Sequence, residues 1–149
     1  KMKMNGYTSH KKTKDEWFSP PFYDRPGGYK FCLKVDVYGT GSHVSVYVYL
    51  MKGPNDDRLV WPFQGSIEIQ LVNQKKRNKS VVIEFDKKAA DKGRADRAIM
   101  EDTKDIGWGL SQFVSHRRVE KVTDRSQYLT DDCLTFIIAD ITIKCSTAH

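Results

Sequence analysis

Hydrophobic and polar residues alternate along most of the chain with a period of two, which is typical of half-buried β-strands. In the clearest case, segment 29–38, one face carries Tyr29, Phe31, Leu33, Val35 and Val37. The opposite face carries Lys30, Cys32, Lys34, Asp36 and Tyr38. Gly39 and Gly41 follow within a few residues, so the next strand is expected to return as a hairpin.

Further segments share this alternation and are predicted to be strands: 44–51, 66–73 and 81–85. In the second of these, Ile67, Ile69 and Leu71 are expected to face inward. Residues 133–144 also form a strand-like apolar run, but this run does not alternate cleanly. That irregularity predicts either cover on both faces or a β-bulge.

The remaining segments are less regular. Residues 2–7 are predicted to be a short edge strand with Met2 and Met4 facing inward, and residues 8–16 a polar loop. The charged segment 87–105 has almost no large apolar residue, so we expect a long surface loop there, with room for one helical turn.

Seven or eight strands, short turns and no long amphipathic helix predict an all-β protein, an antiparallel β-sandwich. The 149 residues suit one domain with one core, so residues 1–149 are taken as a single domain. No apolar run approaches the roughly 20 residues needed to span a bilayer, and no signal-peptide pattern is present. Because the chain does not start with Met, we expect a fragment of a longer protein.

The residues that usually carry catalytic or metal chemistry are scattered. The three cysteines cannot all pair within the chain and lack metal-ligand spacing: Cys32, Cys133 and Cys145. A reduced, cytoplasmic setting is the simplest interpretation. No nucleophile elbow, phosphate-binding glycine loop or metal cluster is visible, so no cofactor, no metal and no enzymatic activity are expected of this domain. A Ser-His-Asp pairing of distant residues stays open.

The formal net charge is +6 at pH 7, and it is unevenly spread. Residues 75–97 hold nine Lys or Arg against four Asp or Glu. A basic segment of this kind can bind nucleic acid or an anionic membrane. The interleaved aromatic residues that stack on bases are missing, so a solvated loop is favoured and no nucleic-acid partner is expected.

Four strings carry a resemblance to a known family: FSPPFYDRPGGYKFCLKV, SVYVYLMKGPNDDRLVWPF, GWGLSQFV and YLTDDCLTFIIADITI. In this order and spacing they resemble the C-terminal domain of tumour-necrosis-factor-receptor-associated factors (TRAF), within the MATH (meprin and TRAF homology) group. The resemblance runs from about Met2 to Ile143. The LMKG and WPF strings favour the TRAF branch over the meprin and ubiquitin-ligase-adaptor branches.

The resemblance implies an eight-stranded TRAF/MATH sandwich that acts as an adaptor in signal transduction. Its expected partners are extended peptides from cytoplasmic receptor tails or signalling adaptors, bound along a sheet edge by main-chain hydrogen bonds. It also implies a homotrimer in the full-length protein, driven by an upstream coiled coil, and a RING ubiquitin ligase can lie upstream as well. The alternatives are a substrate-recruitment module of a ubiquitin ligase and a basic surface module acting through residues 75–97.

The resemblance places two charged residues in the peptide-binding site. In the family, a basic residue and a tyrosine two positions on read the acidic end of the ligand, and Lys34 and Asp36 hold these places here. Lysine keeps the charge but lacks the planar fork of arginine, and Asp36 would repel a ligand carboxylate. A solvated strand lysine is the alternative for Lys34.

Four further positions match the family's groove: Tyr47, Phe85, Gly107 and Trp108. The resemblance implies that Tyr47 lines the central pocket, Phe85 forms its wall, Gly107 lays its backbone against the ligand and Trp108 lines the groove. The alternatives are an outer-face tyrosine, a turn glycine and two core aromatics. The three serines that bind a ligand glutamine in the family have no counterpart near 91–93, so a shifted ligand preference is expected.

Overall fold

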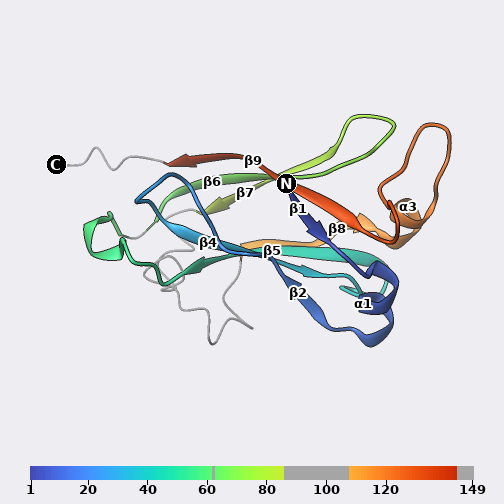
Figure 1. The fold of residues 1–149 in the computed structure, drawn as a ribbon, viewed down its shortest axis with the longest axis horizontal. Helices are drawn as coiled ribbons and strands as arrows, with labels where there is room; N and C mark the ends of the chain where they lie inside the picture. The colour runs from blue at the N-terminus through green and yellow to red at the C-terminus, as the bar shows by residue number, and fades with distance from the viewer. Residues whose placement is uncertain (62, 86–107, 144–149) are drawn as a thin grey trace.

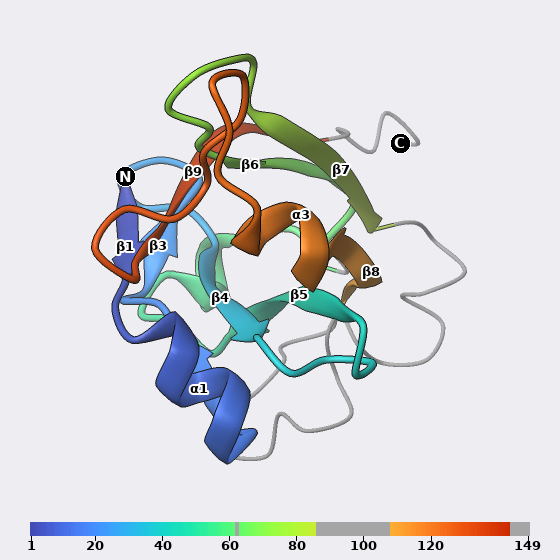
Figure 2. The same ribbon diagram turned by 90° about the vertical axis from the view of Figure 1, so that its right-hand side faces the viewer.

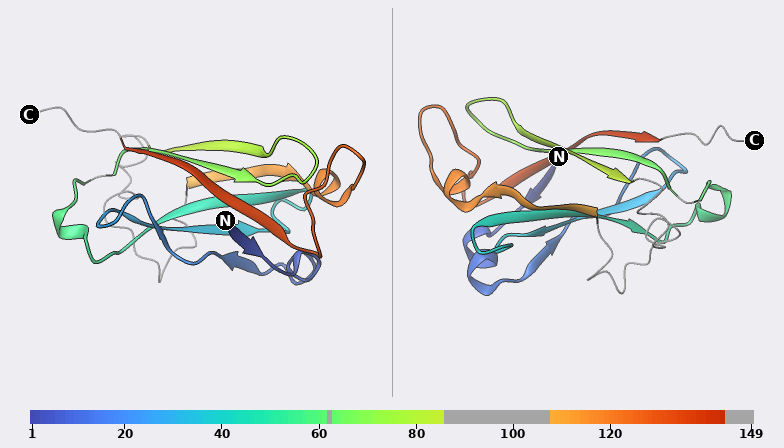
Figure 3. Two further views of the ribbon diagram at one scale, coloured as in Figure 1. Left: turned by 45° about the horizontal axis from the view of Figure 1, so that its top comes forward. Right: turned by 180° about the vertical axis from the view of Figure 1, so that it is seen from behind.

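The computed structural model describes residues 1–61, 63–85 and 108–143, and within them the chain forms two antiparallel sheets. Figure 3 shows the sheets as two stacked layers. The first sheet contains, in spatial order, β1 (Met2–Met4), β9 (Leu134–Ile143), β6 (Gly65–Leu71) and β7 (Lys79–Phe85). The second contains β2 (Glu16–Phe18), β4 (Lys30–Asp36), β5 (His43–Met51) and β8 (Trp108–Ser115), with β3 (Phe22–Tyr23) paired to β4. The helices are α1 (Tyr7–Thr13), the 3-10 turn η1 (Asp56–Arg58) and α3 (His116–Glu120).

The core lies between the layers, where the alternating apolar residues of both sheets meet. The inward residues predicted for β4 and β6 are all buried. An aromatic cluster fills one part of this core: Phe31, Phe63, Phe85 and Tyr29 contact one another edge to face. Such pairs stabilise the core beyond the area they bury, by about 1 kcal/mol each.

The sandwich predicted from alternation is confirmed, with nine strands in the described residues instead of seven or eight. The additional strands are the short segments β2 and β3, which pair along one side of β4. The hairpin between β4 and β5 is present. The irregularity predicted near the end of the chain is a bulge, since the β6–β9 register shifts between Glu68 and Ile69.

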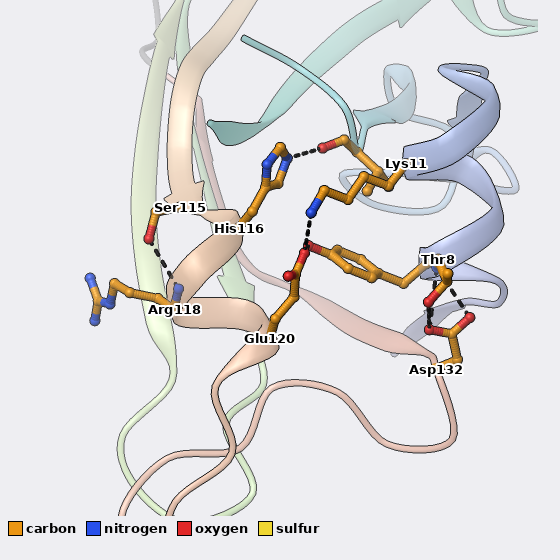
Figure 4. Close-up of polar contacts among 9 residues, drawn as sticks. Thr8, Lys11, Ser115, His116, Arg118, Glu120 and Asp132 are labelled. Carbon is orange, nitrogen blue, oxygen red and sulfur yellow. Dashed lines mark hydrogen bonds and ion pairs between the residues drawn. The ribbon is translucent and has the colours of Figure 1, made fainter. Parts of the chain in front are cut away.

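The polar loop predicted over residues 8–16 is wrong, because α1 occupies most of that segment. The helix has only seven residues and is held from outside. Asp132 accepts hydrogen bonds from the amide and hydroxyl of Thr8, and Glu120 accepts from Tyr7 and pairs with Lys11 (Figure 4). Partners more than 100 residues away explain why local sequence could not indicate this helix.

The turns gather at two ends of the sandwich. One end carries α1, α3, the β6–β7 turn and the loop that follows α3 (Figures 1 and 2). The opposite end carries the β5–η1 segment. β7 and β8 lie next to each other as the outer strands of the two sheets, so the sandwich presents an edge of each sheet on this side.

Candidate functional site

A row of paired residues crosses the outer face of the second sheet. Phe18 of β2 lies opposite Lys34 of β4, Lys34 opposite Tyr47 of β5, and Tyr47 opposite Gly109 of β8. Paired residues of antiparallel strands share a face. The row therefore places two predicted site residues, Lys34 and Tyr47, side by side and leads to the edge strand β8.

Lys34 is the most constrained member of this row. It is 6% exposed, and its ammonium nitrogen lies 2.7 Å from Oε2 of Glu16. The same nitrogen lies over the rings of Tyr47 and Tyr49, at 5.1 and 5.6 Å from their centroids. Burial lowers the pKa of Lys34, but hydrogen bonds to Glu16 and Tyr49 raise it above its usual range. Lys34 is thus a charged, paired residue, and the solvated lysine considered as an alternative is not what the structure shows.

Asp36 lies on the same face, two residues along β4, and is half-buried. Its Oδ1 accepts a hydrogen bond of 3.0 Å from the amide of Gly39. Gly39 has a φ of 55°, and a side chain there would meet the carbonyl oxygen of His43 at 2.1 Å. Asp36 therefore stabilises the tight β4–β5 turn in addition to placing a negative charge near Lys34.

Phe85 and Trp108 lie on the other side of the sheet from Lys34 and Tyr47. Their ring centroids are 4.6 Å apart, and Phe85 is 1% exposed, in contact with Phe63 of the core cluster. Trp108 is half-buried at the start of β8. The structure thus brings these two predicted residues together as an aromatic pair at the rim of the core. Gly107 lies outside the described residues.

β8 is the edge of its sheet in the part of the chain that the structure describes, and its middle is open to solvent. Residues 109–112 are exposed, and Leu110 keeps 41% of its surface. The β5–β8 register shifts between Val44 and Val46, and the hydroxyl of Ser45 donates to the carbonyl of Ser111 within this irregularity. An exposed edge strand offers unpaired main-chain groups to another chain.

Gly109 allows β8 to approach β5 closely. A Cβ atom there would lie 2.0 Å from the carbonyl oxygen of Val46 and 2.7 Å from the Cα of Tyr47. Any side chain would push the edge strand away from its neighbour. Gly109 thus sets how close the edge strand β8 lies to β5. It was not identified from the sequence.

Glu16 was also missed. The segment Glu16-Trp17-Phe18 alternates like a strand, with Trp17 packed on Phe136 in the core and Glu16 on the outer face. That alternation was the only signal for a strand here. It covers three residues, too few to outweigh the polar residues before it, which favoured a loop. The pairing of Glu16 with Lys34 required the β2–β4 register, which depends on the folded chain.

A separate surface hollow of about 550 Å³ lies beside β3 and is lined by residues 23–27 and Asn55. None of the predicted site residues lines it. The Asp24 carboxylate there already accepts hydrogen bonds from the amide of Tyr29 and from Arg25. The Asp24 carboxylate, the main hydrogen-bond acceptor of this hollow, is therefore already occupied. The outer-face row is the better candidate for a binding site.

Side chains that could ligate a metal ion are dispersed among the described residues. Within residues 1–61, 63–85 and 108–143, no cluster of His, Cys, Asp or Glu is arranged to hold a metal ion. Burial raises the pKa of the Cys32 thiol, whose Sγ donates to the carbonyl of Ser19, so it is a poor nucleophile. The helices of the described residues are all far shorter than a membrane-spanning helix.

The sequence of this chain matches one known protein family over most of its length. The family model, described as TRAF/meprin, MATH domain, matches residues 14–137. TNF receptor-associated factor 5 of Mus musculus is 32% identical over 126 residues, which cover 82% of this chain and 22% of that protein. TNF receptor-associated factor 2 of Homo sapiens is 34% identical over 131 residues, covering 84% and 25%. The chain thus spans about a quarter of the length of these relatives.

A solved structure shows the same fold. TRAF5 from Notothenia coriiceps superposes with a TM-score of 0.73 over 99% of this chain and 72% of that chain, at 21% sequence identity. At this identity the likeness concerns the arrangement of strands. It agrees with the two antiparallel sheets described above.

Proposed function

Because the chain belongs to the TRAF/meprin MATH domain family, we propose that it binds short extended peptides from receptor tails or signalling adaptors by strand addition at β8. The observation that supports this most directly is the exposed edge of β8 at residues 109–112, adjoining the outer-face row. Main-chain hydrogen bonds to an edge strand supply affinity, and neighbouring side chains supply specificity. MATH domains of this kind are protein-interaction domains and not catalytic ones.

The residues proposed to contact the peptide lie on both sides of that edge. Tyr47, half-buried and one strand in from β8, offers a ring to a ligand side chain on the outer face. Trp108 begins the β8 edge, and Phe85 supports the Trp108 ring from the core. Gly107, which precedes Trp108 in the sequence and lies outside the described residues, is proposed as a further contact on the family resemblance alone. Because Phe85 is 1% exposed, its proposed part in the site is to hold the Trp108 ring in place at the rim of the groove.

We propose that the site prefers peptides without an acidic side chain at the position near Lys34. Lys34 would be the group that attracts a ligand carboxylate, but Glu16 already occupies it at 2.7 Å. An acidic ligand would have to displace Glu16 and would also approach Asp36 on the same face. Neutral or basic peptide side chains incur neither cost, so we expect them at this position.

In its cellular setting the domain is proposed to be cytoplasmic and to act within a homotrimer of the full-length protein. Residues 1–149 would form one peptide-binding unit of that assembly, with trimerisation supplied by a segment outside this chain. Weak single sites become effective when three are joined, because the second and third contacts are intramolecular. We also propose that the full-length protein carries a RING ubiquitin ligase domain outside this chain.

The mode of binding can be tested on the ligand side. A random library of extended peptides is screened by fluorescence polarisation. The best binder is then remade as two peptides, one N-methylated on the odd-numbered amides and one on the even-numbered amides. Because strand addition uses only every second ligand amide, one of these peptides should lose binding while the other stays within about twofold of the parent. Equal loss from both sets, or no saturable binder, contradicts the proposal.

The location can be tested with matched tyrosine variants. Tyr47→Ala should weaken the selected peptide about tenfold, the loss of one well-packed aromatic contact. Tyr23→Ala is the control, because Tyr23 is an exposed tyrosine on β3, away from the β8 edge. If both variants weaken binding equally, the outer-face row is not the site.

A further inference from the structure

The positive charge of the chain is concentrated in two segments. Residues 73–79 carry four Lys or Arg and no acidic residue, and residues 116–127 carry four against two. Together they hold a net charge of +6, which equals the net charge of the whole chain. The rest of the chain is therefore charge-balanced, and these two segments account for the excess.

The two segments lie side by side at one end of the sandwich (Figures 1 and 2). Asn73, which is buried, links them: its Oδ1 accepts from the amide of Gln127 and its Nδ2 donates to Ser126. The Lys75 ammonium also donates to the carbonyl of Thr123, at 3.0 Å. The β6–β7 turn and the loop after α3 are thus fixed together as one projecting unit.

Six exposed basic side chains on this unit define what we call the basic end surface: Lys76, Arg77, Arg117, Arg118, Lys121 and Arg125. None of the ion pairs found among the described residues uses any of them. The acidic Glu120 between them is directed to Lys11 and Tyr7 of α1, whereas the Arg118 side chain points away from that pair (Figure 4). The basic groups are therefore left without intramolecular partners in this part of the chain.

We propose that the basic end surface docks on the phosphates of an anionic lipid bilayer. A cluster of this size is sufficient for peripheral attachment, since each Lys or Arg near an anionic membrane contributes about a fivefold gain in partitioning. Segments 73–79 and 116–127 contain no Phe, Tyr or Trp, so they lack the rings that single-stranded nucleic acids stack on.

The loop after α3 also favours a bilayer over a soluble polyanion. Val122 is 53% exposed and lies between Lys121 and Thr123 in the loop that follows α3. An exposed apolar side chain next to a basic one suits the headgroup level of a membrane, where the basic group meets phosphate and the apolar group meets the acyl boundary. This surface is separate from the β8 edge, so the inference does not depend on the proposed peptide site.

The test is flotation of the 149-residue chain with two kinds of vesicle, phosphatidylcholine alone and phosphatidylcholine with about one-third phosphatidylserine. The chain should float with the anionic vesicles only, and binding should fall as salt is raised because the attraction is screened. Equal binding to both vesicles, or binding to the anionic vesicles that resists high salt, would overturn the proposal. So would binding to RNA or an acidic peptide with none to vesicles at physiological salt.

Charge-reversal variants locate the surface. Arg77→Glu combined with Arg118→Glu changes one residue on each segment and should lower the vesicle partition coefficient by at least roughly 25-fold. Lys52→Glu with Arg58→Glu makes the same change in charge at the opposite end of the sandwich, where both residues are exposed, and should change it by less than about threefold. Both pairs should keep the thermal midpoint of the parent chain. Equal loss from the two pairs would overturn the location.

A third variant separates a bilayer from other polyanions. Val122→Trp should raise partitioning to the anionic vesicles severalfold, since tryptophan favours the membrane interface. Retention on heparin, which offers charge but no acyl boundary, should stay unchanged. A gain on heparin equal to that on vesicles, or no gain on vesicles, would overturn bilayer docking through this loop.

Discussion

Glu16 determines the state of Lys34, the most buried charge of the proposed site. Glu16→Gln removes the carboxylate 2.7 Å from the ammonium nitrogen and leaves a charge at 6% exposure without its counter-ion. We expect the free energy of unfolding to fall by about 2 kcal/mol, as for a lost hydrogen bond between charged groups. Urea denaturation measures it. Glu84→Gln, at an exposed position on β7, is the control and should change stability by less than about 0.5 kcal/mol.

The same substitution tests the proposed ligand preference. In Glu16→Gln, Lys34 is free to pair with a ligand, so peptides with an acidic side chain at that position should gain affinity relative to neutral ones, by about tenfold. Titration of matched Glu and Gln peptides by fluorescence polarisation gives the ratio directly. If the ratio does not move, Glu16 does not compete with ligand for Lys34.

Asp36 combines a structural and an electrostatic role that two variants can separate. Asp36→Asn keeps an oxygen that accepts from the Gly39 amide but removes the charge, whereas Asp36→Tyr removes both. Both should improve the affinity of an acidic peptide. Only Asp36→Tyr should lower the free energy of unfolding, by about 1 kcal/mol, because the turn loses its hydrogen bond. A gain with Asp36→Tyr alone would show that the ring, and not the lost charge, acts on the ligand.

Which face each strand residue takes could be predicted from the sequence, but its burial could not. Lys34 and Tyr47 share the outer face as the period of two indicates. Tyr49 on that same face is 1% exposed, however, and Phe18 of β2 lies 6.3 Å from its ring. The period-two alternation indicates on which face of the strand a side chain lies. Whether that side chain is buried depends on which other segments of the chain pack on that face.

Among the elements, α1 shows most clearly what local sequence does not contain. Seven residues are too few for a stable isolated helix, and Gly6 at its start provides no side-chain cap. Asp132 supplies the missing acceptor to Thr8, and Tyr7 reaches Glu120 at 2.9 Å. The long alternating strands β4, β5 and β6 were predictable because each contains its own pattern, whereas α1 depends on contacts across the fold.

The docking of α1 on α3 should depend on pH. Burial raises the pKa of Glu120, but hydrogen bonds from Lys11 and Tyr7 lower it on balance below its usual range. A depressed folded-state pKa stabilises the fold above the unfolded value of about 4.3. That stabilisation disappears as the pH falls through the folded-state pKa, when the carboxylate is protonated in both states.

Glu120→Gln should therefore destabilise the chain at pH 7 and do so progressively less below about pH 4. The carboxylate keeps 43% of its side-chain surface in solvent, so the difference at pH 7 should stay below about 1 kcal/mol. Thermal unfolding of both proteins across this range, at low and high salt, measures it. A difference that is unchanged at acidic pH would assign the effect to packing and not to the charge.

At the scale of the whole molecule, one edge and one end of the sandwich are proposed to bind different partners. The β8 edge with the outer-face row is proposed for peptides, and the basic end surface for lipid. The four basic residues of segment 73–79 fall within the basic segment 75–97 that was identified from the sequence. The contribution of segment 116–127 was not visible, because the two segments meet only in the folded chain, through hydrogen bonds of Asn73 and Lys75.

The oligomeric state of the chain follows from its exposed apolar groups. Among residues 1–61, 63–85 and 108–143, the exposed large hydrophobic side chains come from separate segments: Phe18, Tyr23, Val60, Val82, Leu110 and Val122. Scattered single residues do not form the continuous apolar core that a stable oligomer interface requires. The sequence also contains no heptad repeat that would form a coiled coil.

We therefore expect light scattering to give the mass of a monomer, 17.2 kDa, at micromolar concentration. Fusing an unrelated trimeric coiled coil to the N-terminus should leave the affinity for a single peptide unchanged, since the site is complete within one chain. Affinity for a surface that carries many copies of the peptide should rise by a factor of about 100 or more, because later contacts are intramolecular. A trimer without the fusion would contradict this view and place an assembly interface within the MATH domain itself.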